Sequence, residues 1–501
     1  MSGVNPPKDE FLAAVAGGAI SPLWAGPMEL PACGPAEAFR ALRKGGYSVL
    51  LESVRPDRTT GRYSFIATEP YMVFKAKGKS VEVARDGMRA ALTRPPLAKL
   101  RELMANYKVE RVPGLPPFVG GCVGFLSYDF VHNFEDIPHS AVDDLDIPDA
   151  YFIFIDSVAA FDHVEGKLWL MSCPGAADRQ MGYVLPEGDE WSGAYDRAEA
   201  RIIEMGSRIA EAEASVKSAC ACGGGGGVKA EPLISKGDYE DMVRRAKEYI
   251  AAGDIFQANL SQRLSADVGG IEPYDIYTVL REVNPSPFAA YVDFPDVKIA
   301  SSSPERLVRL VDGVVDTRPI AGTRPRGKDT TGDDAMRAEL LLNEKERAEH
   351  IMLIDLERND LGRVCDYGSV HVDELMATED YSHVIHIVSN VTGKLAEGRD
   401  AFDVIRAAFP GGTITGVPKV RCMEVIDELE PVARGPYTGS IGYISHTGDM
   451  DMNIVIRTFV IKDDRAYVQV GAGIVADSDP EREYYETLNK AEALVRTLER
   501  L

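Results

Sequence analysis

The chain has 501 residues, of which 45% are hydrophobic and 27% charged, as is typical of a soluble globular protein. Its 55 Lys and Arg residues against 78 Asp and Glu residues leave a formal net charge of −23 at pH 7. This balance argues against nucleic acid or an anionic membrane as the main partner, because both bind basic surfaces. An anionic substrate would have to be met by local arginine, lysine or metal.

The sequence shows no signal for export or membrane insertion. "MSGVNPPKDEF" at the N-terminus lacks a basic region followed by an apolar core. Apolar runs such as "YFIFIDSVAAF" are short and interrupted, so we expect no membrane-spanning segment. The seven cysteines are odd in number and lack the spacing of a disulfide framework, so we expect a cytoplasmic protein in a reducing environment.

The first half of the chain predicts antiparallel strands. Alternating, aromatic-rich segments occur at residues 62–78 and 151–172, and a helix is predicted over 195–216. "GGCVGF" around Cys122 matches the nucleophile turn of glutamine amidotransferases. No suitably placed histidine accompanies it, so we favour a glycine-rich strand turn over a catalytic cysteine.

A flexible connection is predicted in the middle of the chain. Five consecutive glycines within residues 218–234 cannot hold regular structure cheaply. Cys220 and Cys222 beside them are two ligands on a loop, which is more often incidental than a metal site. We therefore divide the chain into an N-terminal region, a linker and a C-terminal region, at residues 1–217, 218–234 and 235–501.

The second half alternates helices with strands. Helices are predicted over 236–254, 333–360 and 400–409, and strands over 288–294, 315–322, 450–461 and 465–475. Residues 455–473 read as a hairpin. This mixture favours an α+β fold with large antiparallel sheets over a doubly wound parallel sheet.

Two predicted helices each carry a pair of glutamates spaced three residues apart. Glu346 and Glu349 form one pair, and Glu483 and Glu486 form the other. Residues at this spacing share a helix face, so the carboxylates can converge. For the second pair, ordinary N-terminal helix capping is the alternative. Two such faces opposite each other would suit a hard cation such as Mg²⁺.

Glycine-rich loops suggest contacts with an anion. Residues 409–421 place Thr413 and Lys419 around a predicted helix start, where backbone amides form an anion cradle. In "GAGIVAD", Gly471 and Gly473 allow backbone amides to approach a ligand carboxylate, although a plain turn explains this motif equally well.

Isolated polar residues in apolar strands are ambiguous by themselves. His386 lies near His383 in the sequence. Its alternative interpretation is an ordinary core histidine whose hydrogen bonds are satisfied within the protein. Arg457 is more suspicious, because a buried guanidinium needs a carboxylate from the protein or a substrate. The arginines around Gly322 and Thr323 could equally form a solvated basic turn.

Eight motifs in a fixed order carry a resemblance to a known family. They are "SSSPERL", "TRPIAGTRPRG", "EKERAEHIMLIDLERNDLGRV", "YSHVIHIVS", "PGGTITGVPK", "GPYTGSIGY", "IVIRT" and "GAGIVADSDPEREYYETLNK". Together they resemble the chorismate-utilising enzymes, specifically anthranilate synthase component I and aminodeoxychorismate synthase component I. The resemblance covers nearly all of residues 235–495 and implies large antiparallel sheets packed face to face with flanking helices.

The resemblance implies a role for each matching residue. Glu305 would protonate the departing ring hydroxyl, which requires a raised pKa, and His386 would lie near that centre. The glutamates Glu346, Glu349, Glu483 and Glu486 would bind Mg²⁺, directly or through water. The substrate and its carboxylates would be held by Gly322, Thr323, Thr413, Tyr437, Arg457, Gly471, Gly473 and Lys490.

The implied reaction is amination of chorismate by ammonia, with two products possible. Replacement at carbon 4 gives 4-amino-4-deoxychorismate for p-aminobenzoate and folate, whereas addition at carbon 2 with pyruvate loss gives anthranilate for tryptophan. The best-studied aminodeoxychorismate synthases carry a lysine at the position of Ala321, whereas anthranilate synthases carry an alanine, as this chain does. Segments such as "DIFQANLSQRL" and "NPSPFAAYVDF" are closer to aminodeoxychorismate synthases, including members without the lysine, so we favour that product.

The resemblance also implies partners. Nothing in the chain resembles a working glutaminase, so ammonia from glutamine would require a separate glutamine amidotransferase subunit. A tryptophan pocket would involve Leu51, Glu52, Ser53, Asn284, Pro285, Ser286 and Pro287, with simple packing of sheet edges as the alternative. A catalytically silent, tryptophan-binding regulator is a further alternative. Against it, a silent protein has no need for the repelling carboxylates.

Overall fold

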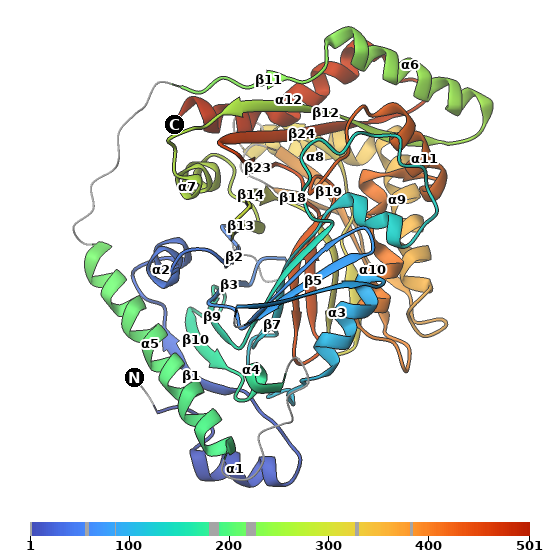
Figure 1. The fold of residues 1–501 in the computed structure, drawn as a ribbon. Helices are drawn as coiled ribbons and strands as arrows, with labels where there is room; N and C mark the ends of the chain where they lie inside the picture. The colour runs from blue at the N-terminus through green and yellow to red at the C-terminus, as the bar shows by residue number, and fades with distance from the viewer. Residues whose placement is uncertain are drawn as a thin grey trace.

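The computed structural model describes residues 3–55, 60–85, 87–179, 190–216, 227–325, 330–380 and 384–501. Two large antiparallel sheets dominate this part of the chain, with helices around them (Figure 1). The expected α+β fold with face-to-face antiparallel sheets is thereby confirmed.

Sheet A has twelve described strands, and eleven of them form a continuous hydrogen-bonded series. In spatial order these are β1 (Leu23–Glu29), β10 (Lys167–Ser172), β9 (Ser157–Asp162), β3 (Tyr63–Thr68), β2 (Ser48–Glu52), β13 (Phe288–Phe294), β14 (Val297–Ser303), β23 (Thr458–Lys462), β24 (Arg465–Ile474), β12 (Gln257–Asp267) and β11 (Glu231–Pro232). The short strand β20 (Gly416–Val417) also pairs with β12.

Sheet B likewise has twelve described strands. Their order is β17 (Ile320–Pro325), β19 (Val384–Lys394), β16 (Val314–Thr317), β15 (Arg306–Val311), β22 (Met450–Asn453), β21 (Ser440–Ser445), β7 (Gly121–Leu126), β8 (Ala150–Ile155), β4 (Met72–Lys77), β5 (Ser80–Arg85) and β6 (Met88–Thr93). Strand β18 (His371–Asp380) pairs with the other side of β19.

Helices flank both sheets. They are α1 (Lys8–Ala16), α2 (Pro35–Leu42), α3 (Pro96–Ala105), α4 (Ala176–Arg179), α5 (Glu190–Val216), α6 (Lys236–Ala252), α7 (Pro273–Val283), α8 (Thr330–Leu342), α9 (Glu344–Gly362), α10 (Ala401–Ala408), α11 (Lys419–Leu429) and α12 (Pro480–Glu499), with 3₁₀ turns η1 (Tyr128–Asn133) and η2 (Gly412–Ile414). The long helix α5 lies along β1 and β10, whereas α9 packs on β17 and β19 (Figure 1). None of the described helices has the length and apolarity needed to cross a bilayer.

Both sheets contain strands from both halves of the chain. In sheet A, β2 pairs with β13, and in sheet B, β7 pairs with β21. Residues 218–226 of the predicted linker lie outside the described residues, and Glu231–Pro232 forms β11 on the edge of sheet A. Each sheet therefore combines strands from before and after residues 218–234. The division of the chain at this linker stays a prediction.

The predicted hairpin is present and its turn has a clear cause. Lys462 and Arg465 are register partners, so only Asp463 and Asp464 connect β23 to β24. Both aspartates have positive φ, 50° and 60°. Two consecutive residues of this kind make the turn whose twist matches paired strands, and Asp tolerates it better than most side chains.

The predicted helix over 333–360 is wrong as one element, because the structure divides it into α8 and α9 at Asn343. The Asn343 side chain accepts a hydrogen bond from the Glu346 amide, the contact that defines a helix N-cap. An N-cap starts a new helix, so Glu346 and Glu349 lie in the first two turns of α9.

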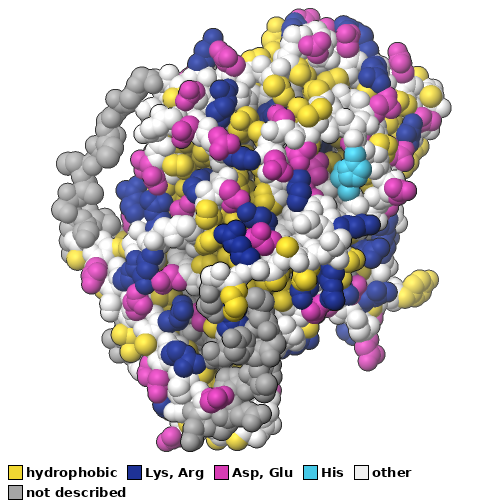
Figure 2. Space-filling model, in the orientation of Figure 1, with side chains coloured by type: hydrophobic (Ala, Val, Ile, Leu, Met, Phe, Trp, Pro, Cys, Tyr) yellow, Lys and Arg dark blue, Asp and Glu magenta, His cyan; other side chains and the backbone are white. Residues whose placement is uncertain are grey.

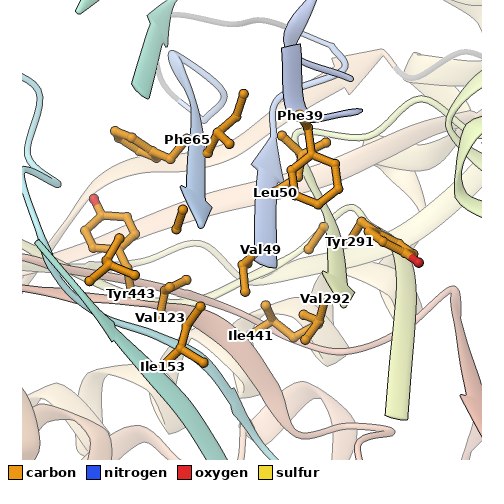
Figure 3. Close-up of a cluster of buried hydrophobic side chains, with 14 of the residues drawn as sticks. Phe39, Val49, Leu50, Phe65, Val123, Ile153, Tyr291, Val292, Ile441 and Tyr443 are labelled. Carbon is orange, nitrogen blue, oxygen red and sulfur yellow. The ribbon is translucent and has the colours of Figure 1, made fainter. Parts of the chain in front are cut away.

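The main core lies between the sheets. In Figure 3, Val123, Ile153, Ile441 and Tyr443 of sheet B face Val49 and Val292 of sheet A, and all are buried. Phe39 of α2 covers the other face of sheet A, with its ring 5.9 Å from that of Tyr291. This double burial explains the nearly continuous apolar strand sequences.

Charged side chains of both signs are interspersed on the face shown in Figure 2.

Cys122, which sequence alone left open as a nucleophile, lies fully buried inside β7, and burial raises the pKa of its thiol. A nucleophilic cysteine needs an accessible thiolate, so this environment supports the interpretation as part of a strand.

Candidate active site

Glu305 immediately precedes β15 and is buried. Burial raises its pKa to about 7, and the neighbouring Thr413 hydroxyl and Ile320 amide offset only part of the rise. Within the described residues, Glu305 Oε1 and Thr413 Oγ1 are buried and have no hydrogen-bond partner. A buried carboxyl group that is about half protonated at pH 7, next to a hydroxyl, is suited to donate a proton to a ligand.

A β-bulge places Gly322 and His386 next to each other. Ala321 pairs with Ile387 and Thr323 pairs with His386, so Gly322 is the extra residue, and its φ is +61°. His386 Nδ1 donates to the Gly322 carbonyl at 3.1 Å, which requires the Nδ1-protonated tautomer. Burial lowers the pKa of His386 to about 4, with Arg457 adding to the effect, so this ring is neutral at pH 7.

Arg457 is held in the left-handed backbone region, with φ +54°, between β22 and β23. Burial lowers its pKa, and no carboxylate of the described residues pairs with it. A desolvated guanidinium without an acidic partner needs an anion, and a strained backbone is found mostly at functional positions. The expectation that Arg457 receives a substrate carboxylate is thus supported but untested.

Tyr437, Gly471 and Lys490 meet at one corner of the site. A Cβ on Gly471 would lie 2.8 Å from Tyr437 Oη and 2.6 Å from Asn259 Oδ1. Lys490 Nζ donates to the Gly471 carbonyl at 3.0 Å. Only glycine fits here, because any side chain would collide with these polar groups.

Gly473, two residues further along β24, likewise leaves space for a side-chain amide. Its Cβ would lie 2.5 Å from Gln257 Nε2. Gln257 and Asn259 alternate on β12, so both amides stand on the face that the two glycines leave open. The sequence analysis missed these amides, although their alternation with apolar residues in "QANL" was a usable signal.

The four predicted metal-binding glutamates are each placed on a helix, but not as one group. Glu346 forms an ion pair with Arg324 at 3.1 Å, and Glu486 forms one with Lys490 at 3.0 Å. Within the described residues, no three acidic, histidine or cysteine side chains lie close enough to hold a metal ion. The chemistry of four carboxylates fits Mg²⁺, whereas the site itself stays a prediction.

Lys419 does not contribute to the predicted anion cradle. Its ammonium group is 2.5 Å from Asp360 and also donates to the carbonyls of Ala408 and Pro410. Asp360 lies close to Glu357, and burial raises the pKa of both carboxyl groups. Lys419 therefore neutralises a buried acidic pair behind the Thr413 turn instead of facing a ligand.

The remaining predicted substrate residues sit beside this centre. Ala321 lies on β17 one residue before the bulge. A Cβ on Gly322 would lie 2.9 Å from Glu346 Oε2, so this backbone closely approaches α9. The backbone of Thr323 belongs to β17, but its side chain lies outside the described residues, as does His383.

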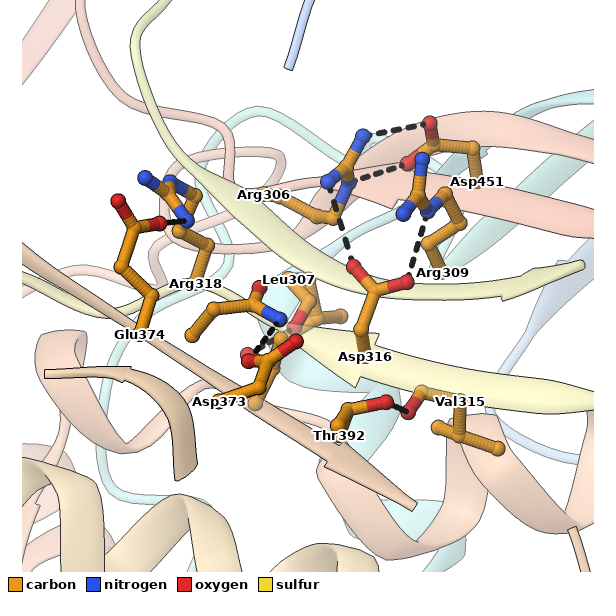
Figure 4. A network of polar contacts seen from close by, with 12 residues as sticks. Arg306, Leu307, Arg309, Val315, Asp316, Arg318, Asp373, Glu374, Thr392 and Asp451 are labelled. Atoms are coloured by element: carbon orange, nitrogen blue, oxygen red, sulfur yellow. Dashed lines mark hydrogen bonds and ion pairs between the residues drawn. The ribbon is translucent and has the colours of Figure 1, made fainter. Parts of the chain in front are cut away.

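A separate cavity of about 630 Å³ opens between the sheets, lined by four of the predicted tryptophan-pocket residues: Leu51, Glu52, Ser53 and Pro287. Aromatic side chains and charged groups complete the lining. The Arg306 and Asp451 side chains that line the opposite wall belong to the ion-pair network of Figure 4, together with Arg309 and Asp316.

The other predicted pocket residues support the cavity from behind. Asn284 Nδ2 donates to the Ser302 carbonyl, and Ser286 Oγ donates to the same oxygen. Neither residue lines the cavity, and neither does Pro285. Glu52 is paired with Arg281 at 2.6 Å, so its charge is already balanced by the protein.

Comparison with known proteins places this geometry in a family. A family model described as chorismate binding enzyme matches residues 47–496. The chain is 44% identical over 453 residues to aminodeoxychorismate synthase component 1 of Bacillus subtilis (strain 168), covering 90% of this chain and 92% of that protein. It is 43% identical over 470 residues to anthranilate synthase component 1 of Acetivibrio thermocellus, covering 93% and 92%.

A solved structure agrees with the sequence comparison. The crystal structure of anthranilate synthase component I from Streptococcus pneumoniae TIGR4 is similar with a TM-score of 0.73 and 35% identity, covering 88% of this chain and 94% of that one. The chain belongs to the chorismate binding enzyme family and is an enzyme that acts on chorismate.

Proposed function

We propose that the protein is the chorismate-aminating component of an aminodeoxychorismate synthase. The observation that carries the amination chemistry is the buried Glu305 carboxyl, whose pKa of about 7 leaves about half of it protonated at pH 7, beside the Thr413 hydroxyl. Loss of a ring hydroxyl needs such an acid, since hydroxide is a poor leaving group.

The other residues of the site bind and orient the substrate. Arg457 and the corner formed by Tyr437 and Gly471 offer cationic and donor groups for carboxylates. Neutral His386, fixed by Gly322, borders the reacting centre without carrying a charge. When bound, Mg²⁺ would supply charge stabilisation at a substrate carboxylate, and Glu346, Glu349, Glu483 and Glu486 would hold it.

The alternative product is anthranilate. Ala321 favours it, because no lysine is available at this position for covalent attack on the ring. The similarity to both kinds of synthase is nearly equal. Under the proposed function, ammonia adds at carbon 4 without a covalent enzyme intermediate.

Product analysis of the purified chain with chorismate, Mg²⁺ and ammonium tests the proposal. We expect a product that retains the enolpyruvyl group and gives p-aminobenzoate only after aminodeoxychorismate lyase is added. Anthranilate with an equal amount of pyruvate would instead establish the alternative. Chelation with EDTA should abolish turnover, and Mg²⁺ should restore it, so full activity after chelation would contradict the metal proposal.

The source of ammonia is part of the same proposal. We expect the isolated chain to use ammonium salts and not glutamine, because a separate amidotransferase component would release ammonia from glutamine. Glutamine-dependent turnover by the isolated chain would contradict this and would require a nucleophile such as Cys122.

We further propose that the 630 Å³ cavity binds tryptophan as a regulator. Ser53 Oγ lies 3.0 Å from the Pro287 carbonyl at the cavity wall, so a larger side chain would enter the cavity. Ser53→Arg should weaken tryptophan binding more than about tenfold by filling this space. Calorimetric titration measures the change, with Ser207→Arg on the exposed face of α5 as control. Equal tryptophan affinity in the Ser53 variant would count against the pocket.

A further inference from the structure

Three buried oxygen atoms around the candidate active site have no hydrogen-bond partner within the described residues. They are Glu305 Oε1, Thr413 Oγ1 and Asn259 Oδ1. Unpaired buried polar atoms are rare and costly, so each requires an explanation, such as a ligand. Glu305 and Thr413 already have proposed roles, whereas Asn259 has none.

The backbone of Asn259 is rigidly held. Its amide donates to the Thr415 carbonyl at 2.9 Å, and its carbonyl accepts from Arg434 Nη2 at 2.6 Å. Asn259 is also a register partner of Gly473 within sheet A. The side chain is therefore presented from a fixed strand and not from a mobile loop, as a substrate-positioning group requires.

The amide of Asn259 reaches the corner where Tyr437 and Lys490 converge. The position of a Cβ on Gly471 lies 2.6 Å from Asn259 Oδ1 and 2.8 Å from Tyr437 Oη. The Lys490 ammonium group donates a hydrogen bond to the carbonyl oxygen of the same glycine. The absent side chain at Gly471 is thus the reason that the amide can enter this corner.

The surroundings indicate which ligand group the amide meets. The Tyr437 hydroxyl can donate, and the Lys490 ammonium group, although paired with the half-exposed Glu486, adds further donors, so the corner favours an anion. A side-chain amide carries two N–H donors on the atom opposite its oxygen, and rotation about its last torsion exchanges the two. In a donor-rich corner, a bound carboxylate favours the orientation with the nitrogen toward the ligand.

We propose that Asn259 is a further substrate-binding residue whose amide N–H donates to a carboxylate of chorismate. This inference rests on the proposed function, in which the same corner holds a substrate carboxylate. It adds a donor from β12 to the groups that β24, α12 and the Tyr437 loop supply. Ammonia is not its ligand.

Two variants separate donation from acceptance. Asn259→Leu removes the donor at similar size, and we expect it to raise the chorismate Kd about tenfold. Asn259→Asp keeps the shape but sets a negative charge against the substrate, and we expect a rise of about 100-fold or more. The KM for ammonium should stay within about twofold in both variants.

Chorismate affinity is measured by fluorescence titration of the full chain without ammonia, and the unfolding midpoint confirms the fold of each variant. Asn133→Leu, which removes an amide bound to the Phe130 carbonyl in η1, is the matched control. If the leucine variant fails to fold, Asn259→Ser replaces it. An Asp variant that binds chorismate as tightly as the unaltered protein overturns the proposal, as does a raised ammonium KM with unchanged chorismate Kd.

Failure of the proposed function gives a different result. If the unaltered protein does not bind chorismate, the substrate assignment fails before any variant is compared. If it binds chorismate but produces anthranilate, the role of Asn259 in carboxylate binding is still tested by the same titrations.

Discussion

Replacing Glu305 by glutamine is expected to lower kcat for chorismate amination about 10²–10⁴-fold, the usual contribution of a general acid. Glutamine keeps the size of the buried side chain, so the Thr413 turn and the strands around it should be preserved. Steady-state rates with saturating chorismate and ammonium measure the loss. Chorismate binding should persist, because the carboxylate-binding residues are unchanged.

The pH dependence of the rate tests whether Glu305 is the acid. Burial raises its pKa to about 7, so the proton is present below pH 7 and is lost as the pH rises through that value. In the unaltered protein, kcat/KM should therefore fall on the alkaline side with a midpoint near 7, and the residual activity of the glutamine variant should lack this limb.

Asp449→Asn is a suitable control for Glu305→Gln, because burial also raises the pKa of the Asp449 carboxyl at a position outside the candidate site. A control variant that loses as much activity as Glu305→Gln would show that the rate responds to any buried carboxyl group. Retention of the alkaline limb in Glu305→Gln would assign that limb to another residue.

Replacing Glu430 by alanine is expected to destabilise the protein by about 3–5 kcal/mol, because it leaves the Arg434 charge buried and unpaired. The two side chains form a double contact, with Arg434 Nε and Nη2 at 2.9 and 2.7 Å from the Glu430 oxygens. Each is only 3% exposed. Urea unfolding followed by circular dichroism measures the shift in midpoint.

The Arg434 guanidinium also forms hydrogen bonds with three separate segments of the candidate site. It donates to the carbonyls of Ile414 and Asn259 and to the Thr438 hydroxyl. We therefore expect Glu430→Ala to raise the chorismate KM as well as to lower the unfolding midpoint, because these segments carry Thr413 and Tyr437.

Glu428 provides the matched control for Glu430. It lies in the last turn of α11, for which Glu430 is the C-cap residue, and it pairs with Arg245, but both side chains are about half exposed. Solvent screening makes such pairs worth less than about 1 kcal/mol, so Glu428→Ala should shift the midpoint little. Equal shifts in the two variants would contradict the buried ion pair as the source of stability.

Local sequence patterns located most strands and helices, but the predicted strands 315–322 and 450–461 were wrong as single elements, because the structure divides them into β16 and β17 and into β22 and β23. The two-residue loop between β23 and β24 and the start of α12 followed from turn and capping chemistry, which depends on adjacent residues. The break at Asn343 follows the same chemistry, but good helix formers on both sides obscured it. Which strands become neighbours was not encoded locally, since β2 pairs with β13 across almost half the chain.

The sequence by itself determined the family, through motifs specific enough to name it, and it predicts Glu305, His386 and Arg457 as residues of the site. Only the tertiary structure decided what each of them experiences. Burial shifts the pKa values of Glu305 and His386, Asp360 draws Lys419 away from the ligand, and Gly471 admits Asn259. The physical reason is that desolvation, ion pairing and close approach depend on groups distant in sequence, which meet only when both sheets have formed.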